Sequence, residues 1–154
     1  MSLKTMPPGT VEEAREFLHE QFEQGFATQE WVQTVEFDPE LDRWYLRFGC
    51  EGRDAATIYF DLRQRSLYYE LYFMPAPELA DGRGNGELWE WLLRRNRSLF
   101  TVHFALGKDG DVYLVGRTPI ERLSETELDR IVGEIYEVTE TWFQPAIRLG
   151  FRRG

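Results

Sequence analysis

The chain has 154 residues, of which 42% are hydrophobic and 15% aromatic, and its formal net charge at pH 7 is −9. This composition excludes an intrinsically disordered chain, and the length suits a single domain, residues 1–154, with a substantial core. The negative charge argues against nucleic acid as a partner, because it repels the phosphate backbone.

The negative charge is concentrated at the start of the chain. Residues 1–42 contain ten carboxylates and only two basic residues, so this part carries most of the excess. We interpret it as a solvated helix face that keeps the protein soluble, with a docking face for a basic partner as the alternative.

The cysteine count and the lack of targeting segments indicate a cytoplasmic protein. Cys50 is the single cysteine, so no intramolecular disulfide can form, and its aromatic strand context indicates a buried small side chain. No run approaches the ~18 apolar residues of a membrane span, and the amino terminus lacks the apolar core of a signal peptide. We expect a cytoplasmic protein that binds no membrane.

The first half of the chain predicts one helix followed by strands. Residues 1–9 form a loose leader, and Thr10 with Glu13 matches a capping box that starts a helix, for which Gly25 is the expected end. Alternation of apolar and polar residues then predicts four strands. Their ranges are 31–37, 43–50, 55–62 and 67–74.

The second half predicts a helix, a hairpin and a long final helix. Asp109 and Gly110 form the turn of the hairpin, and Ser124 with Glu127 caps the final helix, which Pro145 closes. The other expected ranges are 86–96 for the first of these helices, 99–106 and 112–115 for the strands, and 145–154 for a C-terminal tail.

This order, α-β-β-β-β-α-β-β-α, predicts an α+β fold. Runs of strands separated by single helices are typical of an antiparallel sheet with helices packed against it, and not of a parallel α/β sheet.

The helix at 86–96 is apolar on two sides. Its sequence, GELWEWLLRRN, places Leu88, Trp91 and Leu92 on one side, and Trp89 and Leu93 nearly opposite. A surface helix buries one apolar stripe in its own domain. The second stripe therefore predicts an interface at Trp89 and Leu93.

The strand pattern predicts a tyrosine-rich sheet face. Facing the helices we expect Trp44, Ile58, Phe60, Leu71, Phe73, Phe104 and Leu114. The opposite face is then formed by Tyr45, Arg47, Tyr59, Tyr68, Tyr72, His103 and Tyr113. Tyrosine and arginine are enriched in protein interfaces, so the tyrosines and Arg47 are candidate partner-binding residues. The alternative is that the tyrosines only pair with one another across strands.

The sequence offers little for catalysis, and we expect no enzyme, metal or cofactor. His19 lies among glutamates, where a solvated histidine is expected, and two distant histidines with one cysteine make no zinc set. The glycine run DGRGNGE before the helix at 86–96 has neither the dinucleotide nor the Walker spacing, so we interpret it as a connection.

The carboxyl-terminal half resembles the YbjN-domain family. The resemblance rests on FTVHFALGKDGDVYLVGRTPIERLSETELDRIVGEIYEV, with its strand, DG hairpin, second strand and LSETEL helix start, within residues 91–142. It implies a fold like that of type III secretion chaperones, with a twisted antiparallel sheet, helices on one side and usually a dimer. It also implies a non-enzymatic regulator or chaperone-like adaptor linked to stress responses, and assigns the dimer contact of the middle helix to Trp89 and Leu93.

We therefore expect a homodimeric protein-binding module whose partner is a segment laid across or beside the sheet. The alternatives are a small-ligand sensor or enzyme with a pocket between sheet and helices, or a domain that regulates transcription through protein contacts.

Overall fold

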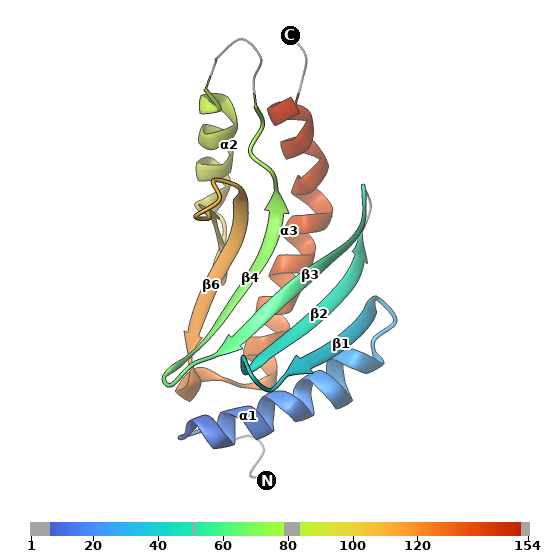
Figure 1. Cartoon of the computed structure of the whole chain (residues 1–154), viewed down its shortest axis with the longest axis vertical. Helices are drawn as coiled ribbons and strands as arrows, with labels where there is room; N and C mark the ends of the chain where they lie inside the picture. The colour runs from blue at the N-terminus through green and yellow to red at the C-terminus, as the bar shows by residue number, and fades with distance from the viewer. Residues whose placement is uncertain (1–6, 51, 79–83, 152–154) are drawn as a thin grey trace.

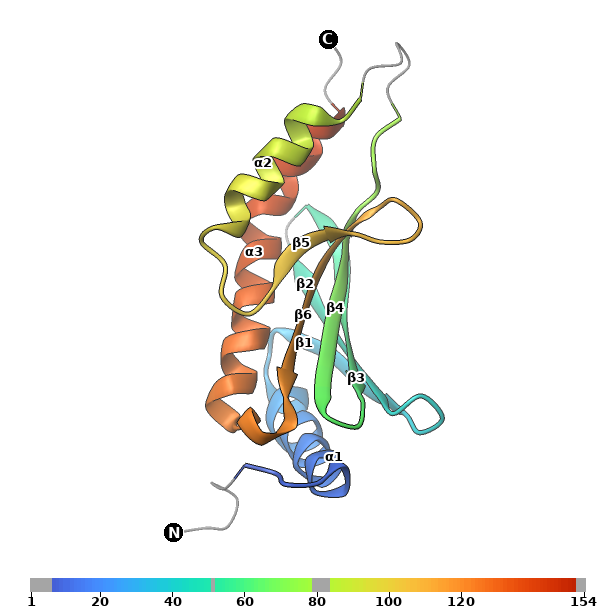
Figure 2. The ribbon, with the colours of Figure 1, turned by 90° about the vertical axis from the view of Figure 1, so that its left-hand side faces the viewer.

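The computed structural model describes residues 7–50, 52–78 and 84–151. One six-stranded antiparallel sheet, with the strand order β1-β2-β3-β4-β6-β5, carries the helices on one side (Figures 1 and 2). The fold class expected from the sequence is confirmed. The elements are α1 (Val11–Glu20), β1 (Val32–Asp38), β2 (Arg43–Cys50), β3 (Arg53–Leu62), β4 (Ser66–Met74), α2 (Gly86–Asn96), β5 (His103–Leu106), β6 (Val112–Pro119) and α3 (Glu125–Phe151).

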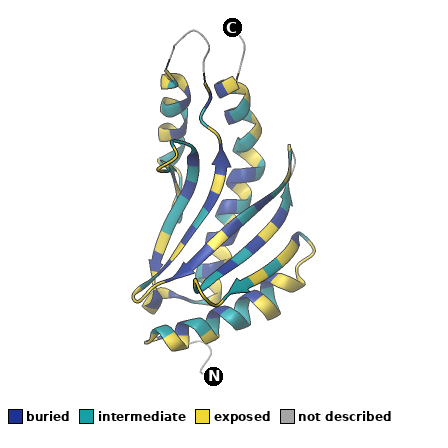
Figure 3. Cartoon of the chain, in the orientation of Figure 1, coloured by how far each residue is buried: buried dark blue, intermediate teal, exposed yellow. Residues whose placement is uncertain are grey.

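The core lies between the sheet and the helices. Helix α3 passes behind the sheet in Figure 1, and α1 and α2 lie at opposite ends of the molecule. Buried residues alternate with more exposed ones along the strands (Figure 3), as the period of two requires. Trp44, Phe48, Phe60 and Phe73 are among the largest side chains with no exposed surface.

The first helical segment does not end at Gly25. Thr10 caps it as expected, its Oγ1 accepting a hydrogen bond from the Glu13 N–H at 3.1 Å. After Glu20 the chain continues through a π turn (Gln21–Gly25) and a 3₁₀ turn (Phe26–Thr28). Buried side chains at intervals of four drift around an α-helix of 3.6 residues per turn, and a wider π turn reverses that drift. Phe22 and Phe26 therefore stay in the core.

His19 is only partly solvated, since 32% of its side chain is exposed. Its ring packs edge-on against Phe37 and Trp44, with centroids 4.4 and 5.1 Å away, and its Nδ1 accepts a hydrogen bond from the Trp44 indole N–H at 3.3 Å. A buried indole N–H needs an acceptor. His19 supplies it, which is a structural role that the neighbouring glutamates concealed in the sequence.

Helix α3 does not end at Pro145, so most of the expected tail is helix. The ring of Pro145 removes one backbone hydrogen bond, yet the helix continues to Phe151 because its last turns are packed. Ala146 and Gly150 are buried. A Cβ at Gly150 would lie 2.8 Å from Cγ of Pro77 and 3.1 Å from Cδ2 of Leu88, so the missing side chain permits close approach of α3 to α2.

The two strands of the final hairpin differ from the expected ranges. β5 begins at His103 and not at residue 99, and β6 extends to Pro119 and not only to residue 115. β6 is longer because it pairs with β4 along its whole length, from Met74↔Val112 to Ser66↔Pro119. The physical cause of the late start of β5 lies in helix α3 and is described below.

Gly116 on β6 allows an aromatic ring from the neighbouring strand to lie directly over it. Tyr69 of β4 pairs with Gly116, and a Cβ at this position would lie 2.4 Å from Cε2 of Tyr69 and 2.2 Å from the Thr101 carbonyl oxygen. The Tyr69 hydroxyl, which is almost fully buried, donates to that same carbonyl at 2.8 Å. The glycine, the ring and the carbonyl therefore form one tightly packed unit.

Gly116→Ala is expected to lower the free energy of unfolding by about 2–4 kcal/mol, because the new methyl group collides with backbone and a buried ring. The matched control is Gly133→Ala, in an exposed part of α3 where a Cβ meets nothing within 4 Å. That change should stabilise the protein by about 0.5–1 kcal/mol through helix propensity. Urea unfolding followed by circular dichroism measures both, and equal effects would contradict the packing described for Gly116.

Candidate functional site

Two surfaces carry the residues that the sequence singled out. The first, here called the open face, is the side of the sheet that points to the viewer in Figure 1, away from α3. The strand register puts the expected residues on it in rows that cross the strands. One row is Tyr45, Tyr59, Glu70, Val115 and His103, a second is Tyr72 and Tyr113, and Arg47 and Tyr68 belong to neighbouring rows.

Pairs of rings form the centre of the open face. Tyr45 and Tyr59 meet edge-to-face with centroids 5.0 Å apart, and Tyr72 and Tyr113 do the same at 5.2 Å. Cross-strand tyrosine pairing, the alternative interpretation, therefore occurs in the structure. It leaves much of the rings accessible, since Tyr59, Tyr68 and Tyr72 are still 36–40% exposed.

Arg43 is a member of this face that the sequence reasoning missed. Its guanidinium carbon lies 5.1 Å from the Tyr59 ring centroid, and it donates to both carboxylate oxygens of Asp61 at 2.5 and 3.1 Å. The hydrogen bonds to Asp61 raise the pKa of Arg43. The sequence contained the information, because residue 43 is two positions from Tyr45 and four from Arg47, and alternate residues of a strand lie on the same face. Asp61 likewise has the parity of Tyr59.

The hydroxyls of two tyrosines are occupied by aspartates of the β5–β6 turn. Tyr72 donates to Asp111 at 2.8 Å, and Tyr113 donates to Asp109 at 2.6 Å. Desolvation and the hydrogen bond to Asp111 raise the pKa of Tyr72 to about 12. For Tyr113 the hydrogen bond to Asp109 is the main cause of a rise to about 12. Such phenols remain neutral at physiological pH, so they offer contact area and not acid–base chemistry.

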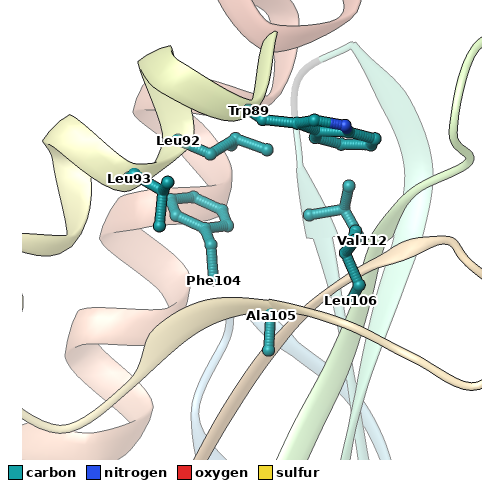
Figure 4. A pocket seen from close by; sticks show the side chains of 7 residues that line it. All are labelled: Trp89, Leu92, Leu93, Phe104, Ala105, Leu106 and Val112. Atoms are coloured by element: carbon teal, nitrogen blue, oxygen red, sulfur yellow. The ribbon is translucent and has the colours of Figure 1, made fainter. Parts of the chain in front are cut away.

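The second surface is an apolar pocket of about 270 Å³ between α2 and the β5–β6 hairpin, here called the α2–β5 pocket (Figure 4). Leu93 of α2 is 65% exposed beside it, and Trp89 is half-buried. Leu88 and Leu92 are buried on the inner side of the helix, as expected. The lining residues are Trp89, Leu92, Leu93, Phe104, Ala105, Leu106 and Val112.

The side chain of Asn96 occupies the outer edge of the sheet beside this pocket. Asn96, the last residue of α2, accepts from the Phe104 N–H at 2.7 Å and donates to the Phe104 carbonyl at 3.2 Å. In an antiparallel ladder both groups of a residue point to the same side. Those of Phe104 thus face away from β6, and the carboxamide of Asn96 replaces a neighbouring strand there. Strand addition at the middle of β5 is blocked.

Glu134 of α3 holds the chain just before β5. One of its carboxylate oxygens accepts from the N–H groups of Thr101 and Val102 at 2.7 and 3.1 Å and from the Thr101 hydroxyl at 2.8 Å, and the other accepts from the Phe100 N–H at 3.1 Å. These donors are directed at α3, so they cannot pair with β6, which explains the late start of β5. Burial raises the pKa of Glu134, but the hydrogen bonds outweigh it and the net pKa is lowered.

The structure does not bring the remaining candidates together. His19 is on α1 and packs against Trp44, and His103 is exposed on the open face. Cys50 is half-buried, with Sγ 4.0 Å from the Arg53 carbonyl oxygen, and burial raises the pKa of its thiol. Among residues 7–50, 52–78 and 84–151, no three histidine, cysteine, aspartate or glutamate side chains are arranged to hold a metal ion.

A sequence model of one protein family matches residues 44–148, which include most of the sheet and the two surfaces. The chain belongs to the YbjN family. The family is described as "Putative bacterial sensory transduction regulator". The resemblance found in the carboxyl-terminal half is thereby confirmed, and it extends back to the beginning of β2. In the described part of the chain, no helix has both the length and the apolar character that crossing a bilayer requires.

Two mycobacterial relatives are described as uncharacterised proteins. One from Mycobacterium leprae is 31% identical over 112 residues, which is 73% of this chain and 59% of that protein. Another, from Mycobacterium tuberculosis, is 39% identical over 66 residues, 43% of this chain and 36% of that protein. The matches thus span between about a third and three fifths of the relatives' lengths.

A solved structure also matches at low similarity. It is that of the Yersinia pestis type III secretion chaperone SycH in complex with a stable fragment of YscM2, with 18% identity and a TM-score of 0.47. The match covers 91% of this chain and 99% of the chaperone.

Glu134→Gln tests the hydrogen bonds before β5. At pH 7 the change is expected to lower the free energy of unfolding by about 1–2 kcal/mol, since hydrogen bonds to a charged acceptor are lost. A carboxylate whose pKa is lowered on folding stabilises the protein above its unfolded pKa, near 4.5, and this contribution is lost as the pH falls through the folded pKa. The difference between wild type and variant should therefore shrink below about pH 5.

The measurement is urea unfolding at a series of pH values, and Glu137→Gln, at an exposed position of the same helix, is the control. A difference between wild type and Glu134→Gln that stays constant down to pH 3 would contradict the assigned role of the carboxylate.

Proposed function

We propose that this protein is a homodimeric, non-enzymatic adaptor that binds another protein through the open face and acts as a regulator in the cytoplasm, in signalling or in a stress response. The observation that carries the proposal is the open face itself. It combines exposed tyrosine rings with hydroxyls that are already hydrogen-bonded, which suits recognition by contact. The description of the family as regulators of sensory transduction supports the regulatory part.

The open face favours a partner segment that lies across the strands. Phe104 of β5 already has its outward groups bonded to Asn96, which disfavours extension of the sheet at that edge. The rings of Tyr59, Tyr68 and Tyr72 offer instead a rigid surface whose contacts cost little conformational entropy, because aromatic side chains have few rotatable bonds.

Helix α2 is the surface that we propose for dimerisation. Leu93 at 65% exposure and the adjoining apolar pocket make up the kind of contiguous apolar surface that marks association sites. This pocket supports a dimer contact better than a small-ligand site. The lining of the pocket lacks the few convergent polar groups that fix the orientation of a ligand.

Trp89→Glu combined with Leu93→Glu is expected to give a soluble monomer, because two buried carboxylates would have to be desolvated at the dimer contact. Sedimentation equilibrium measures the outcome. Leu41→Glu, which introduces the same charge at an exposed leucine in the β1–β2 turn, should remain dimeric. A wild type that sediments as a monomer contradicts dimerisation, and a double variant that stays dimeric contradicts the assigned interface.

Tyr59→Ser combined with Tyr68→Ser tests the open face, since neither ring is needed for the core. A native pull-down with the wild-type protein, read by mass spectrometry, is expected to recover one stoichiometric protein, and the double variant should recover at least about tenfold less. Leu41→Ser with Phe151→Ser, which removes two exposed apolar side chains elsewhere, is the matched control. Equal recovery by all three proteins would exclude the open face as the binding surface.

A further inference from the structure

Phe100 is the most exposed large apolar side chain among the described residues, at 84%. It lies in the connection between the end of α2 and the start of β5, and Figure 2 shows this connection. Leu93 and Leu106, at 65% and 56%, are the next most exposed. All three fall within fourteen residues of the chain, on and between the two elements that form the α2–β5 pocket. The exposed apolar surface is thus concentrated around this pocket and its neighbouring loop.

The backbone that carries Phe100 is held in place. Its N–H donates to Glu134, the next residue donates to Glu134 through both N–H and hydroxyl, and the Thr101 carbonyl accepts from Tyr69. The loop is therefore fixed between α3 and the sheet. An exposed aromatic ring on a fixed backbone loses little freedom on binding, which is the property of an anchor residue in an interface.

The same part of the chain contains a cavity that such a ring can enter. The α2–β5 pocket measures about 270 Å³ and is lined by apolar side chains from α2 and from the β5–β6 hairpin. Leu93 and Leu106, which stand at this pocket, are themselves exposed (Figure 4). A protruding ring and an apolar pocket on one molecule can form a self-complementary contact. Across a twofold axis, the ring of each copy meets the pocket of the other.

The charges of α2 favour a second copy over an unrelated partner. Glu90 in its first half and Arg94 near its end are exposed and form an ion pair with each other at 3.1 Å, and Arg97, directly after the helix, is exposed as well. Glu90, Leu93 and Arg97 are spaced by three and four residues, so they share one side of the helix. Two such helices packed antiparallel about Leu93 bring the acidic half of each towards the basic end of the other. A parallel arrangement, or a partner that is acidic along its whole contact, lacks this complementarity.

We propose that Phe100 of one copy inserts into the α2–β5 pocket of a second copy, and that the reciprocal insertion closes a twofold dimer. This rests on the proposed homodimer and specifies how it is held. Trp89 and Leu93 then act as walls of the socket as well as contacts in their own right. Asn96 occupies the edge of β5 and Glu134 holds the residues just before it, so that the dimer forms through side chains and not by strand pairing.

The test uses one variant without the ring and one with a filled pocket. Phe100→Ala removes the anchor, and Leu106→Trp places a larger ring at the pocket. Each alone is expected to weaken dimerisation by about 100-fold or more, because both symmetric insertions are lost. Both sites are exposed, so the fold should be retained, as urea unfolding will show.

Mixing the two variants gives the decisive result. A mixed dimer keeps one intact insertion, of Phe100 from the Leu106→Trp copy into the open pocket of the Phe100→Ala copy. The mixture is therefore expected to dimerise at least about tenfold more tightly than either variant alone, as measured by sedimentation with one variant fluorescently labelled. Phe151→Ala, at another exposed aromatic residue, is the control and should dimerise like wild type.

The failures of the two proposals are distinguishable. A wild-type dimer that Phe100→Ala leaves unchanged, or a mixture no tighter than its components, overturns the insertion of Phe100 while leaving dimerisation through α2 intact. A wild type that is monomeric at all concentrations overturns both.

Discussion

The carboxylate of Glu134 decides where the last hairpin begins. By accepting from Phe100, Thr101 and Val102, it draws three backbone donors out of the sheet and onto helix α3. The edge strand β5 is consequently short, and the loop before it is fixed. Tyr69 completes the arrangement from the sheet side through its bond to Thr101, which is possible only because residue 116 is glycine.

Hydrogen bonds between elements also fix the two candidate surfaces. Asn96 ties α2 to β5, and Glu134 ties the loop before β5 to α3. The elements around the α2–β5 pocket are therefore held in place, and the edge of β5 beside it is not free to pair with another strand. The open face is likewise fixed, since Asp109 and Asp111 of the β5–β6 turn hold Tyr113 and Tyr72 in place. The molecule thus offers two preorganised surfaces on different sides, one apolar and one rich in tyrosine.

Much of the fold could be predicted from local patterns. The N-cap at Thr10, the alternation through β2 to β4 and the apolar stripe of α3 each depend on neighbouring residues, and the structure agrees with them. The Glu13 carboxylate departs from the capping box, because it accepts from the Gly9 N–H and not from that of Thr10. The errors share a cause. Local preference indicates the end of a helix at Gly25 and at Pro145, and a strand at 99–102. At each place, contacts with a distant element outweigh that preference.

The site shows the same division. The parity of the strands was enough to place Tyr45, Tyr59, Tyr68, Tyr72 and Tyr113 on one face, because a period of two leaves only two choices. The roles of Asn96 and Glu134 had no local signal, since each bonds to backbone 8 or more residues away.

The sequence by itself determined the order of the elements, the face on which each strand residue lies and the two apolar sides of α2, because these follow from helix and strand periods. Only the tertiary structure decided where helices and strands end, that Phe100 is exposed on a fixed loop, and that the edge of β5 is occupied. Those features depend on hydrogen bonds and packing between segments that are distant along the chain.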